Sequence, residues 1–228
     1  MNCDRKISMT VIRRLPKYRR YLKELLNSGI DRISSKDLGE IIGFTASQIR
    51  QDFNNFGGFG QQGYGYNVKE LYNGITDILA LNNRYNTIIV GAGNIGQALS
   101  NYPWLKTSGF HIKALFDLNP RLIGLKIHEH EIMDIDMMEE YVEKNDISIA
   151  FICTPKDASQ KIADRLCKTS IKGLWNFSPI DLSVTDNVVV ENVHLNDSLF
   201  VLSYLIKAGE PSDDGHQEEI ISRIKNEK

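Results

Sequence analysis

The stretch "TIIVGAGNIGQAL", Thr87 to Leu99, decides the fold. A short apolar, β-rich run leads directly into Gly91-x-Gly93-x-x-Gly96, and a helical segment follows. In this fingerprint the first glycine allows a tight turn, the second lets the backbone approach a pyrophosphate, and the third permits close packing of helix on strand. The positive end of the helix favours the phosphates. The pattern predicts the first unit of a Rossmann-type dinucleotide-binding domain.

The next expected strand, "IKALFD", ends in Asp117, twenty-one residues beyond Gly96. A carboxylate at this place accepts hydrogen bonds from the adenosine ribose hydroxyls. It would repel a 2′-phosphate, and Leu118 and Asn119 supply no compensating arginine. We therefore expect NAD(H) rather than NADP(H) as the cofactor. The residues expected to hold it are Gly91, Ala92, Gly93, Asn94, Ile95, Gly96 and Asp117.

Further strands alternate with helical segments along the rest of the chain. "DISIAFICTP" indicates a buried parallel strand with Thr154 and Pro155 at its carboxyl end, where open α/β sheets hold ligands, so both residues join the expected cofactor site. An amphipathic helix is expected over residues 157–170, and "IKGLWNFSP" and "NVVVENV" supply two more strands. The repeated β-α-β pattern predicts an α/β fold with a doubly wound parallel sheet over residues 81–194.

The segment "LNDSLFVLSYLIKAG" carries apolar side chains around almost the whole helix that it predicts. A helix that is apolar all round is buried on several sides. Because it stands just before a polar tail at residues 211–228, we expect residues 195–210 to insert into another subunit or between domains. This implies a homodimer with an exchanged C-terminal helix.

The N-terminal third indicates short helices. "VIRRLPKYRRYLKELLNSG" repeats apolar residues at a spacing of three to four and ends at Gly29. A second helix runs to Ile42 and ends at Gly43, and Thr45 caps a third helix that continues through Phe53. These proportions are those of a helix-turn-helix, although similar helical hairpins occur in proteins that never touch DNA.

The stretch "RQDFNNFGGFGQQGYGY", Arg50 to Tyr66, carries five glycines and five aromatic rings. A loose linker is one interpretation. A β-hairpin in this place would be the wing of a winged helix, whose glycine tip lies against the sugar-phosphate wall or in the minor groove. Residues 1–80 are therefore expected to form a winged-helix DNA-binding domain. The expected DNA contacts are Thr45, Ser47, Gln48, Arg50, Gln51, Gly58, Gly60 and Gln62.

Composition and charge narrow the classes further. The net charge of −2 conceals a basic excess in residues 1–80 and an acidic excess in the remainder, which fits an N-terminal part that meets a polyanion. The longest uncharged apolar run, "ISIAFIC", is far too short to cross a bilayer, and the opening residues show no signal-peptide pattern. We therefore expect a cytoplasmic protein without a membrane segment.

Cysteine and histidine give little sign of a metal site. Cys3, Cys153 and Cys167 show no C-x-x-C spacing, which leaves a disulfide framework or a zinc site without support. His128 and His130 of "HEHE" are typical of an exposed loop or strand edge. No metal is therefore expected.

A dehydrogenase would need an acid or base beside its cofactor. His194 is the only histidine near the expected nicotinamide end, and residues 1–80 leave no separate substrate domain. We assign no catalytic residue and expect a sensor, not an enzyme. An NAD-dependent oxidoreductase with an N-terminal helical assembly domain remains the alternative, and hydride transfer to any substrate would support it.

Several segments together resemble the redox-sensing transcriptional repressor Rex family over about residues 8–208: "RRLPKYRRYL", "ISSKDLGEIIGFTASQIRQDF", "NFGGFGQQGYGYNVKEL", "IIVGAGNIGQAL", "NYPW", "FD", "NFSP" and "ENV". The resemblance implies a homodimer that binds a palindromic double-stranded DNA operator with NAD⁺ or an empty site and releases it with NADH. It also implies that Tyr102 approaches the nicotinamide, and that Phe56, Phe59 and Tyr66 anchor the wing.

The chain departs from the family pattern at three places. Gln51 stands where the family usually has a basic residue after the recognition-helix arginine, and Gln61 and Gln62 stand at the wing tip in place of Lys or Arg. Fewer phosphate contacts would flatten the salt dependence of DNA binding. His194 stands where the family commonly carries an aspartate. A Rex paralogue with a weakened redox response is therefore a further alternative.

Overall fold

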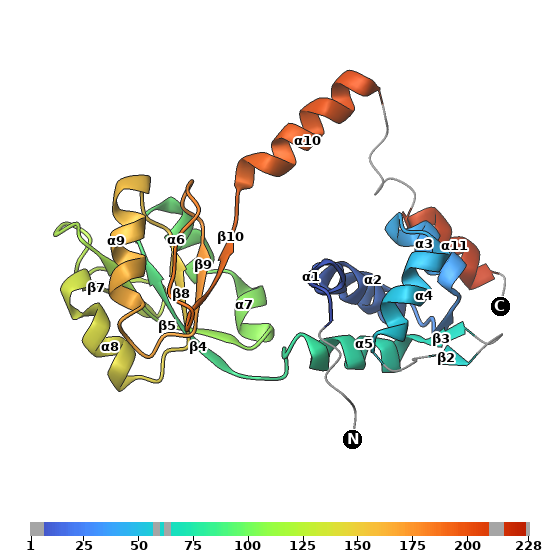
Figure 1. The fold of residues 1–228 in the computed structure, drawn as a ribbon, viewed down its shortest axis with the longest axis horizontal. Helices are drawn as coiled ribbons and strands as arrows, with labels where there is room; N and C mark the ends of the chain where they lie inside the picture. Colours follow the sequence, from blue (N-terminus) through green and yellow to red (C-terminus); the bar gives the residue numbers. More distant parts are fainter. Residues whose placement is uncertain (1–6, 57–59, 62–64, 210–216, 227–228) are drawn as a thin grey trace. The chain divides into compact units, whose positions relative to one another are not determined.

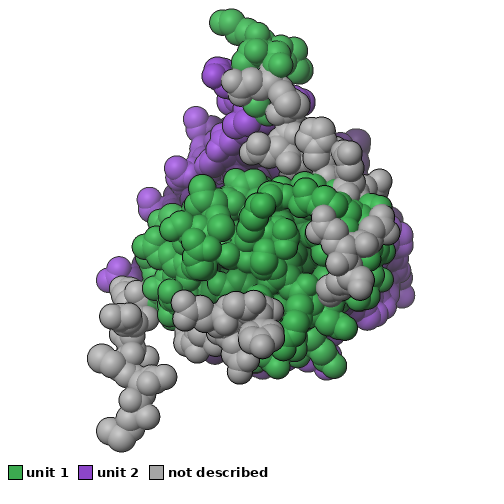
Figure 2. Space-filling view, turned by 90° about the vertical axis from the view of Figure 1, so that its right-hand side faces the viewer, with its two compact units in different colours: residues 1–81, 205–228 green, residues 82–204 purple. Residues whose placement is uncertain are grey.

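The computed structural model describes residues 7–56, 60–61, 65–209 and 217–226 (Figure 1). The chain forms two compact units, coloured separately in Figure 2. Unit 1 comprises residues 1–81 and 205–228, and unit 2 comprises residues 82–204.

Unit 1 is built on short capped helices. Thr45 and Ser34 begin α4 and α3 by accepting hydrogen bonds through their hydroxyl oxygens from the Gln48 and Asp37 backbone N–H groups, at 3.2 and 3.0 Å. The first expected helix is divided in two, and the second part begins at Leu15 with Pro16 in its first turn, the place where proline fits a helix. The helices are α1 (Met9–Ile12), α2 (Leu15–Asn27), α3 (Ser35–Ile42), α4 (Ala46–Asn54) and α5 (Val68–Ile78).

A small antiparallel sheet completes the N-terminal part of this unit. It consists of β1 (Arg32–Ile33), β2 (Gly60–Gln61) and β3 (Gly65–Asn67) in the order β1-β3-β2. Strands β2 and β3 pair after α4, so a hairpin follows the helix-turn-helix (Figure 1). This arrangement is a winged helix, as the sequence predicts.

Side chains from the helices α2, α3, α4 and α5 form the core of unit 1. The Phe53 ring lies 5.0 Å from the rings of Tyr18 and Tyr66, centroid to centroid. Tyr66 and Phe56 are partly buried against this core, consistent with their expected role as wing anchors, whereas Phe59 lies outside the described residues. The wing is therefore tied to the helix that precedes it.

The C-terminal segment, for which the sequence indicated only a polar tail, contains the helix α11 (Gln217–Asn226). Ile224 is buried in the core of unit 1, and the Arg223 guanidinium lies 2.6 Å from a carboxylate oxygen of Glu40 on α3. Figure 1 shows α11 alongside α3. The polar composition of this segment did not indicate a packed helix, because only a few apolar residues contribute to its packing.

Unit 2 is a seven-stranded sheet in the order β10-β9-β8-β4-β5-β7-β6. All neighbours run parallel except the edge hairpin of β6 and β7. The chain moves from β4 to β5 on one side and later returns to β8 on the other, which makes β4 the switch point of a doubly wound sheet. The strands are β4 (Tyr85–Val90), β5 (Phe110–Asp117), β6 (Lys126–Ile127), β7 (His130–Asp134), β8 (Ile149–Ile152), β9 (Gly173–Asn176) and β10 (Val189–Asn192).

Helices cover both faces of this sheet. One apolar cluster packs α8 (Met138–Lys144) and α9 (Lys156–Leu166) against one face, and a second packs α6 (Asn94–Ser100) and α7 (Pro103–Thr107) against the other. A short 3₁₀ turn, η1 (Ile135–Met137), precedes α8. The α9 helix ends at Leu166 instead of continuing to residue 170, and a turn follows. The hairpin β6–β7 and α8 were not predicted from the sequence.

The last expected helix is α10 (Leu195–Ala208), and none of its residues is buried. Its exposed apolar side chains include Phe200, Tyr204 and Ile206, which are 64%, 63% and 74% exposed. Among the helices of the described residues, none combines the length and apolarity that a bilayer span requires.

Candidate functional site

A cleft of about 800 Å³ opens at the carboxyl ends of β4, β5 and β8 in unit 2. The sheet order brings these three strand ends together, as the rule for ligand sites in open α/β sheets requires. Of the residues expected to bind a cofactor, seven line this cleft: Gly91, Gly93, Asn94, Ile95, Asp117, Thr154 and Pro155. We call it the nucleotide cleft.

Each glycine of the fingerprint has a different structural environment, which explains why glycine stands there. Gly91 has a φ of +102°, and a Cβ atom there would lie 2.5 Å from the Cys153 carbonyl oxygen. A Cβ atom on Gly96 would lie 2.0 Å from the Gly91 carbonyl oxygen, so Gly96 allows the helix to pack on the turn. Nothing lies within 4 Å of a Cβ atom on Gly93, which leaves its backbone open to a ligand. The environments of Gly91 and Gly96 fit the turn and the helix packing expected from the sequence, and the approach of a pyrophosphate to Gly93 stays a prediction.

Asp117 is held at the end of β5 by two backbone hydrogen bonds. Its Oδ2 atom accepts from the Ala92 N–H at 2.7 Å, and its Oδ1 atom accepts from the Asn119 N–H at 2.8 Å. An ionised carboxylate has about four acceptor sites, so each oxygen can also accept from a hydroxyl. No Lys or Arg is among the described residues that line the cleft. The surroundings suit a ribose diol better than a 2′-phosphate.

Buried hydroxyl groups organise the end of β8. The Ser159 hydroxyl, fully buried on α9, donates to the Ser178 Oγ at 2.8 Å and lies 3.1 Å from the Thr154 Oγ1. Cys153 also lines the cleft, and burial raises the pKa of its thiol to about 12. The thiol is therefore neutral at physiological pH and is not a nucleophile.

Sequence reasoning missed part of the cleft wall. The β9 strand ends at Asn176, and the segment after it places Phe177 and Pro179 at the cleft. The signal was present, because "NFSP" follows an expected strand at the same sheet edge. Other unpredicted lining residues are Leu118, Asn119, Leu122, Ile135, Cys153, Ala158 and Ile162.

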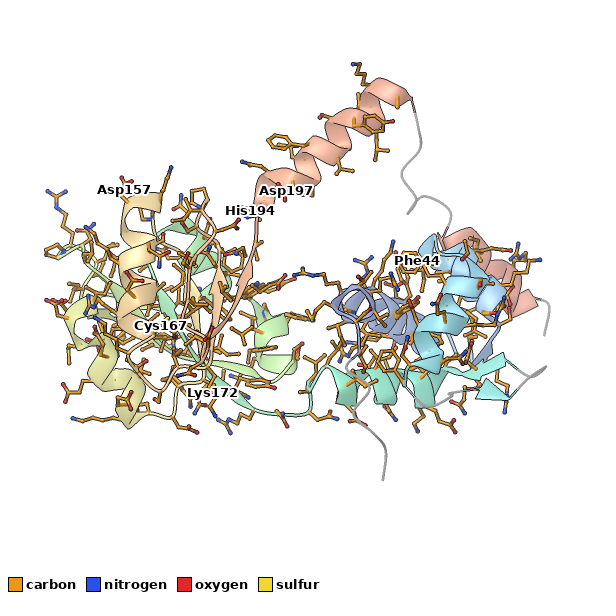
Figure 3. All side chains as sticks on the ribbon, in the orientation of Figure 1. Phe44, Asp157, Cys167, Lys172, His194 and Asp197 are labelled. Atoms are coloured by element: carbon orange, nitrogen blue, oxygen red, sulfur yellow. The ribbon has the colours of Figure 1, made fainter. Side chains whose placement is uncertain are left out.

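Two residues expected near the nicotinamide lie elsewhere in unit 2. Tyr102 lines a separate hollow, described below, and is 55% exposed. His194 lies where β10 passes into α10 (Figure 3), and its Nε2 atom is 2.8 Å from the Asp181 Oδ1. The structure shows no contact between Tyr102 and His194 among its described residues. Their part in a nicotinamide site remains a prediction.

The α4 helix presents a polar face to solvent. Thr45, Ser47, Arg50 and Gln51 are exposed, while Gln48 is half-buried. The Arg50 Nη1 atom donates to the Ser35 Oγ on α3 at 2.9 Å, which directs the guanidinium across the helix-turn-helix. Gly60 belongs to β2, whereas Gly58 and Gln62 lie outside the described residues. The exposed side chains of Thr45, Ser47, Arg50 and Gln51 can contact phosphates and base edges in the way a recognition helix does.

The opposite side of α4 is anchored by a buried ion pair that sequence reasoning did not identify. Asp52, 1% exposed, accepts hydrogen bonds from Arg14 at 2.6 and 2.8 Å and from the Tyr18 hydroxyl at 2.8 Å. Burial raises the pKa of Tyr18, so its hydroxyl stays protonated and donates. This triad fixes the orientation of α4 on α2.

A group of three or more His, Cys, Asp or Glu side chains suited to a metal ion is absent from the described part of the chain. The fold and its two sites define a class: a winged-helix DNA-binding domain joined to a Rossmann-type nucleotide-binding domain.

Comparisons with known proteins place the chain within that class. A family model described as "Putative DNA-binding protein N-terminus" matches residues 6–54, and one described as "CoA binding domain" matches residues 82–180. The redox-sensing transcriptional repressor Rex of Clostridium botulinum (strain Hall) is 64% identical over 92% of this chain and 100% of its own length. That of Thermoanaerobacter pseudethanolicus is 56% identical over 100% and 97%.

A solved structure of RSP in complex with β-NAD⁺ and operator DNA superposes with a TM-score of 0.83 at 56% identity and covers 97% of this chain and 98% of its own. RSP in complex with β-NADH gives 0.83 at 53% identity over 96% and 99%, and a third structure describes RSP as a Rex-family repressor. This chain belongs to the Rex family of redox-sensing transcriptional repressors. The fold class predicted from the sequence is thereby confirmed.

Proposed function

We propose that this protein is a transcriptional repressor that binds operator DNA through its winged helix and releases it when NADH occupies the nucleotide cleft. The observation that carries the proposal is Asp117, bonded to the Ala92 N–H inside a cleft whose described lining has no basic side chain. The relatives support it, since RSP was solved with β-NAD⁺ and operator DNA and with β-NADH.

Three parts of the cofactor have a matching group in the cleft: the adenosine ribose, the pyrophosphate and the path toward the nicotinamide. The Asp117 carboxylate would accept hydrogen bonds from the adenosine ribose, and the pyrophosphate would lie on the Gly93 backbone at the beginning of α6. Thr154 and Pro155 would border the path toward the nicotinamide, together with Phe177. The nicotinamide carries the redox state, and these groups bind and orient it without a catalytic acid or base.

A homodimer is the assembly that the surface supports. The α10 helix buries none of its residues and exposes a nearly continuous apolar surface. Unit 2 also carries a hollow of about 330 Å³ lined almost entirely by apolar residues, among them Trp104, Phe151 and Trp175. Contiguous exposed apolar surface marks an interface. Two copies would place two winged helices on the two halves of a palindromic duplex, in the cytoplasm where the DNA lies.

The redox response requires two arrangements of this dimer with different cofactor contacts. A ligand shifts an equilibrium only as far as its affinities for the two states differ. We place His194 and Tyr102 among the groups whose contacts change, because His194 lies at the beginning of α10 and Tyr102 is exposed beside α7.

The test is a titration of labelled duplex with the full chain. The duplex is selected from a random pool for binding to this protein, and its affinity is measured without cofactor, with NAD⁺ and with NADH. We expect saturable binding in the first two conditions and a loss of affinity with NADH. Equal DNA affinity in all three conditions would indicate a Rex paralogue that binds DNA without a redox response. Absence of selective DNA binding, together with NADH oxidation, would favour an NAD-dependent oxidoreductase.

A further inference from the structure

A second hollow, of about 660 Å³, lies in unit 2 at the amino ends of the sheet strands, whereas the nucleotide cleft lies at their carboxyl ends. Its lining comes from the amino ends of three neighbouring strands, at Arg84 before β4, His111 in β5 and His128–His130 at the beginning of β7, and from α7. None of the residues that line the nucleotide cleft lines this hollow. We call it the basic hollow.

Basic side chains from separate elements line the basic hollow. Arg84, Lys106 and Lys113 line it, and Glu129 is the one carboxylate among its described lining residues. Glu129 lies 3.7 Å from the Lys106 Nζ, and both side chains are about 70% exposed, so this pair is weak. No carboxylate of a described residue lies within ion-pair distance of Arg84 or Lys113. The described lining therefore carries three cations against one carboxylate, and because all three cations are exposed, water and salt screen part of their mutual repulsion.

His111 and His130 both have a lowered pKa, for which burial is the first cause and the neighbouring cations a further one. The pKa of His111 is lowered by burial first and then by Arg84, Lys113 and Lys106. Burial likewise lowers the pKa of His130; Glu129 opposes the shift, and Lys106, His128 and Lys113 add to it. Two imidazoles on different strands thus share the same cations. On the adjoining hairpin, Lys126 and Glu131 are register partners across β6 and β7.

An anion would relieve the repulsion and could be contacted from several sides. Lysine and arginine bind phosphate oxygens through charge-assisted hydrogen bonds. Next to the basic groups, Leu105, Phe110 and Ile112 give the hollow an apolar wall. The volume falls within the range of small-molecule sites, about 300–1,000 Å³. A concave basic site with one apolar wall fits a small phosphorylated molecule better than an extended polymer.

We propose that the basic hollow is a second ligand-binding site, which binds a small phosphorylated molecule through Arg84, Lys106 and Lys113, with His111 and His130 as additional donors. Because a bound anion stabilises the protonated imidazoles, binding raises the lowered pKa values of His111 and His130, and it strengthens as the pH falls from 8 to 6. Binding at these cations does not require the cofactor or DNA, although Tyr102 also lines the basic hollow, and Leu105 and Phe110 are shared with the apolar hollow described above.

Pyrophosphate is the probe that tests the site. Histidine-ring ¹H–¹⁵N spectra of the full chain are recorded during the titration, at constant ionic strength and at pH 6 and pH 8. The His194 ring serves as an internal reference outside the hollow. We expect saturable shifts of the His111 and His130 rings, a dissociation constant for the pyrophosphate trianion at least about threefold higher at pH 8, and a Lys113→Gln variant at least about threefold weaker. The control variant is Lys172→Gln, an exposed lysine of unit 2 outside the hollow (Figure 3).

Three results would overturn the proposal. One is a titration in which no histidine ring shifts, or in which His194 shifts in parallel with His111. Another is an equal loss of affinity in the Lys113→Gln and Lys172→Gln variants. The third is a Lys113→Gln variant that binds DNA more weakly but pyrophosphate unchanged, which would make the hollow part of a polyanion surface. If Lys113→Gln fails to fold by circular dichroism, Arg84→Gln replaces it under the same criteria.

Discussion

Asp117 and Ala92 are joined by a 2.7 Å hydrogen bond, from the Ala92 backbone N–H to the Asp117 Oδ2. The bond links the end of β5 to the glycine turn after β4. The carboxylate expected to select the ribose therefore also holds the turn expected to receive the pyrophosphate. Substitutions of Asp117 can separate its charge from its hydrogen bond to the turn.

Asp117→Ala is expected to weaken NADH binding and narrow its preference over NADPH. Loss of a charge-assisted hydrogen bond costs about 1.5–3 kcal/mol, roughly ten- to 150-fold in Kd. Asp117→Asn keeps an acceptor for the Ala92 N–H but removes the charge, so it should retain more affinity while losing selectivity. Fluorescence titrations with both cofactors measure this. If the alanine variant keeps affinity and selectivity, Asp117 is not the ribose ligand.

Arg50→Ala is expected to weaken binding to the selected duplex while leaving NADH binding intact. A good arginine contact to a guanine contributes about 1–3 kcal/mol of discrimination. Ser35→Ala is the matched control, because Ser35 accepts a hydrogen bond from Arg50 at 2.9 Å and its loss leaves the guanidinium present. Gel-shift titrations should therefore show a smaller loss for Ser35→Ala. Unchanged affinity in Arg50→Ala would remove this residue from the readers.

Arg14→Ala is expected to destabilise the winged helix by about 3 kcal/mol, because it leaves the buried Asp52 carboxylate without its guanidinium partner. Tyr18→Phe removes one hydrogen bond to the same carboxylate and should cost about 1 kcal/mol. Adding Asp52→Asn to Arg14→Ala removes the uncompensated charge and should recover part of the loss. Urea denaturation measures all three, and a double variant no more stable than Arg14→Ala would argue against this account.

The contact between α11 and α3 is expected to depend on pH. Arg223 lowers the pKa of Glu40 through a hydrogen bond, so the stabilisation is present above the ordinary glutamate pKa of 4.5 and is lost as pH falls through the lower folded value. The Arg223 and Glu40 side chains are 48% and 35% exposed. Screening by solvent therefore limits the stabilisation from this pair to less than about 1 kcal/mol.

Arg223→Ala should accordingly lower the urea midpoint at pH 7 and have a smaller effect at pH 3.5. Lys36→Ala is the control, since the Lys36 Nζ lies 3.9 Å from Glu40 and its side chain is 79% exposed. An equal effect of Arg223→Ala at both pH values would assign its role to packing and not to charge.

The effect of NADH on DNA affinity is expected to differ between about pH 6 and pH 8, because histidine changes charge in this range and aspartate does not. His194→Asp should reduce the difference. Asp181→Asn tests the observed partner, since the His194 Nε2 lies 2.8 Å from the Asp181 carboxylate. Duplex binding with and without saturating NADH at both pH values gives the answer. An identical NADH effect at the two pH values would leave His194 without a role in the response.

Local pattern by itself determined the two kinds of domain, most of their helices and strands, and the centre of the nucleotide cleft, whereas the β6–β7 hairpin, α8 and α11 escaped it. The spacing of Gly91, Gly93 and Gly96 and the carboxylate of Asp117 follow from contacts made within one βαβ unit, where sequence separation sets geometry. The helices around Thr45 were equally predictable, because a capping side chain and its N–H partner lie three residues apart.

Tertiary structure alone decided the contacts between distant segments. Arg14 meets Asp52, Arg223 meets Glu40, and Phe177 reaches the cleft because packing brings separate elements together. The basic hollow likewise exists only because a parallel sheet aligns the amino ends of β4, β5 and β7. Periodicity carries no information about such pairs, since the free energy of burying and pairing them depends on how the chain folds back on itself.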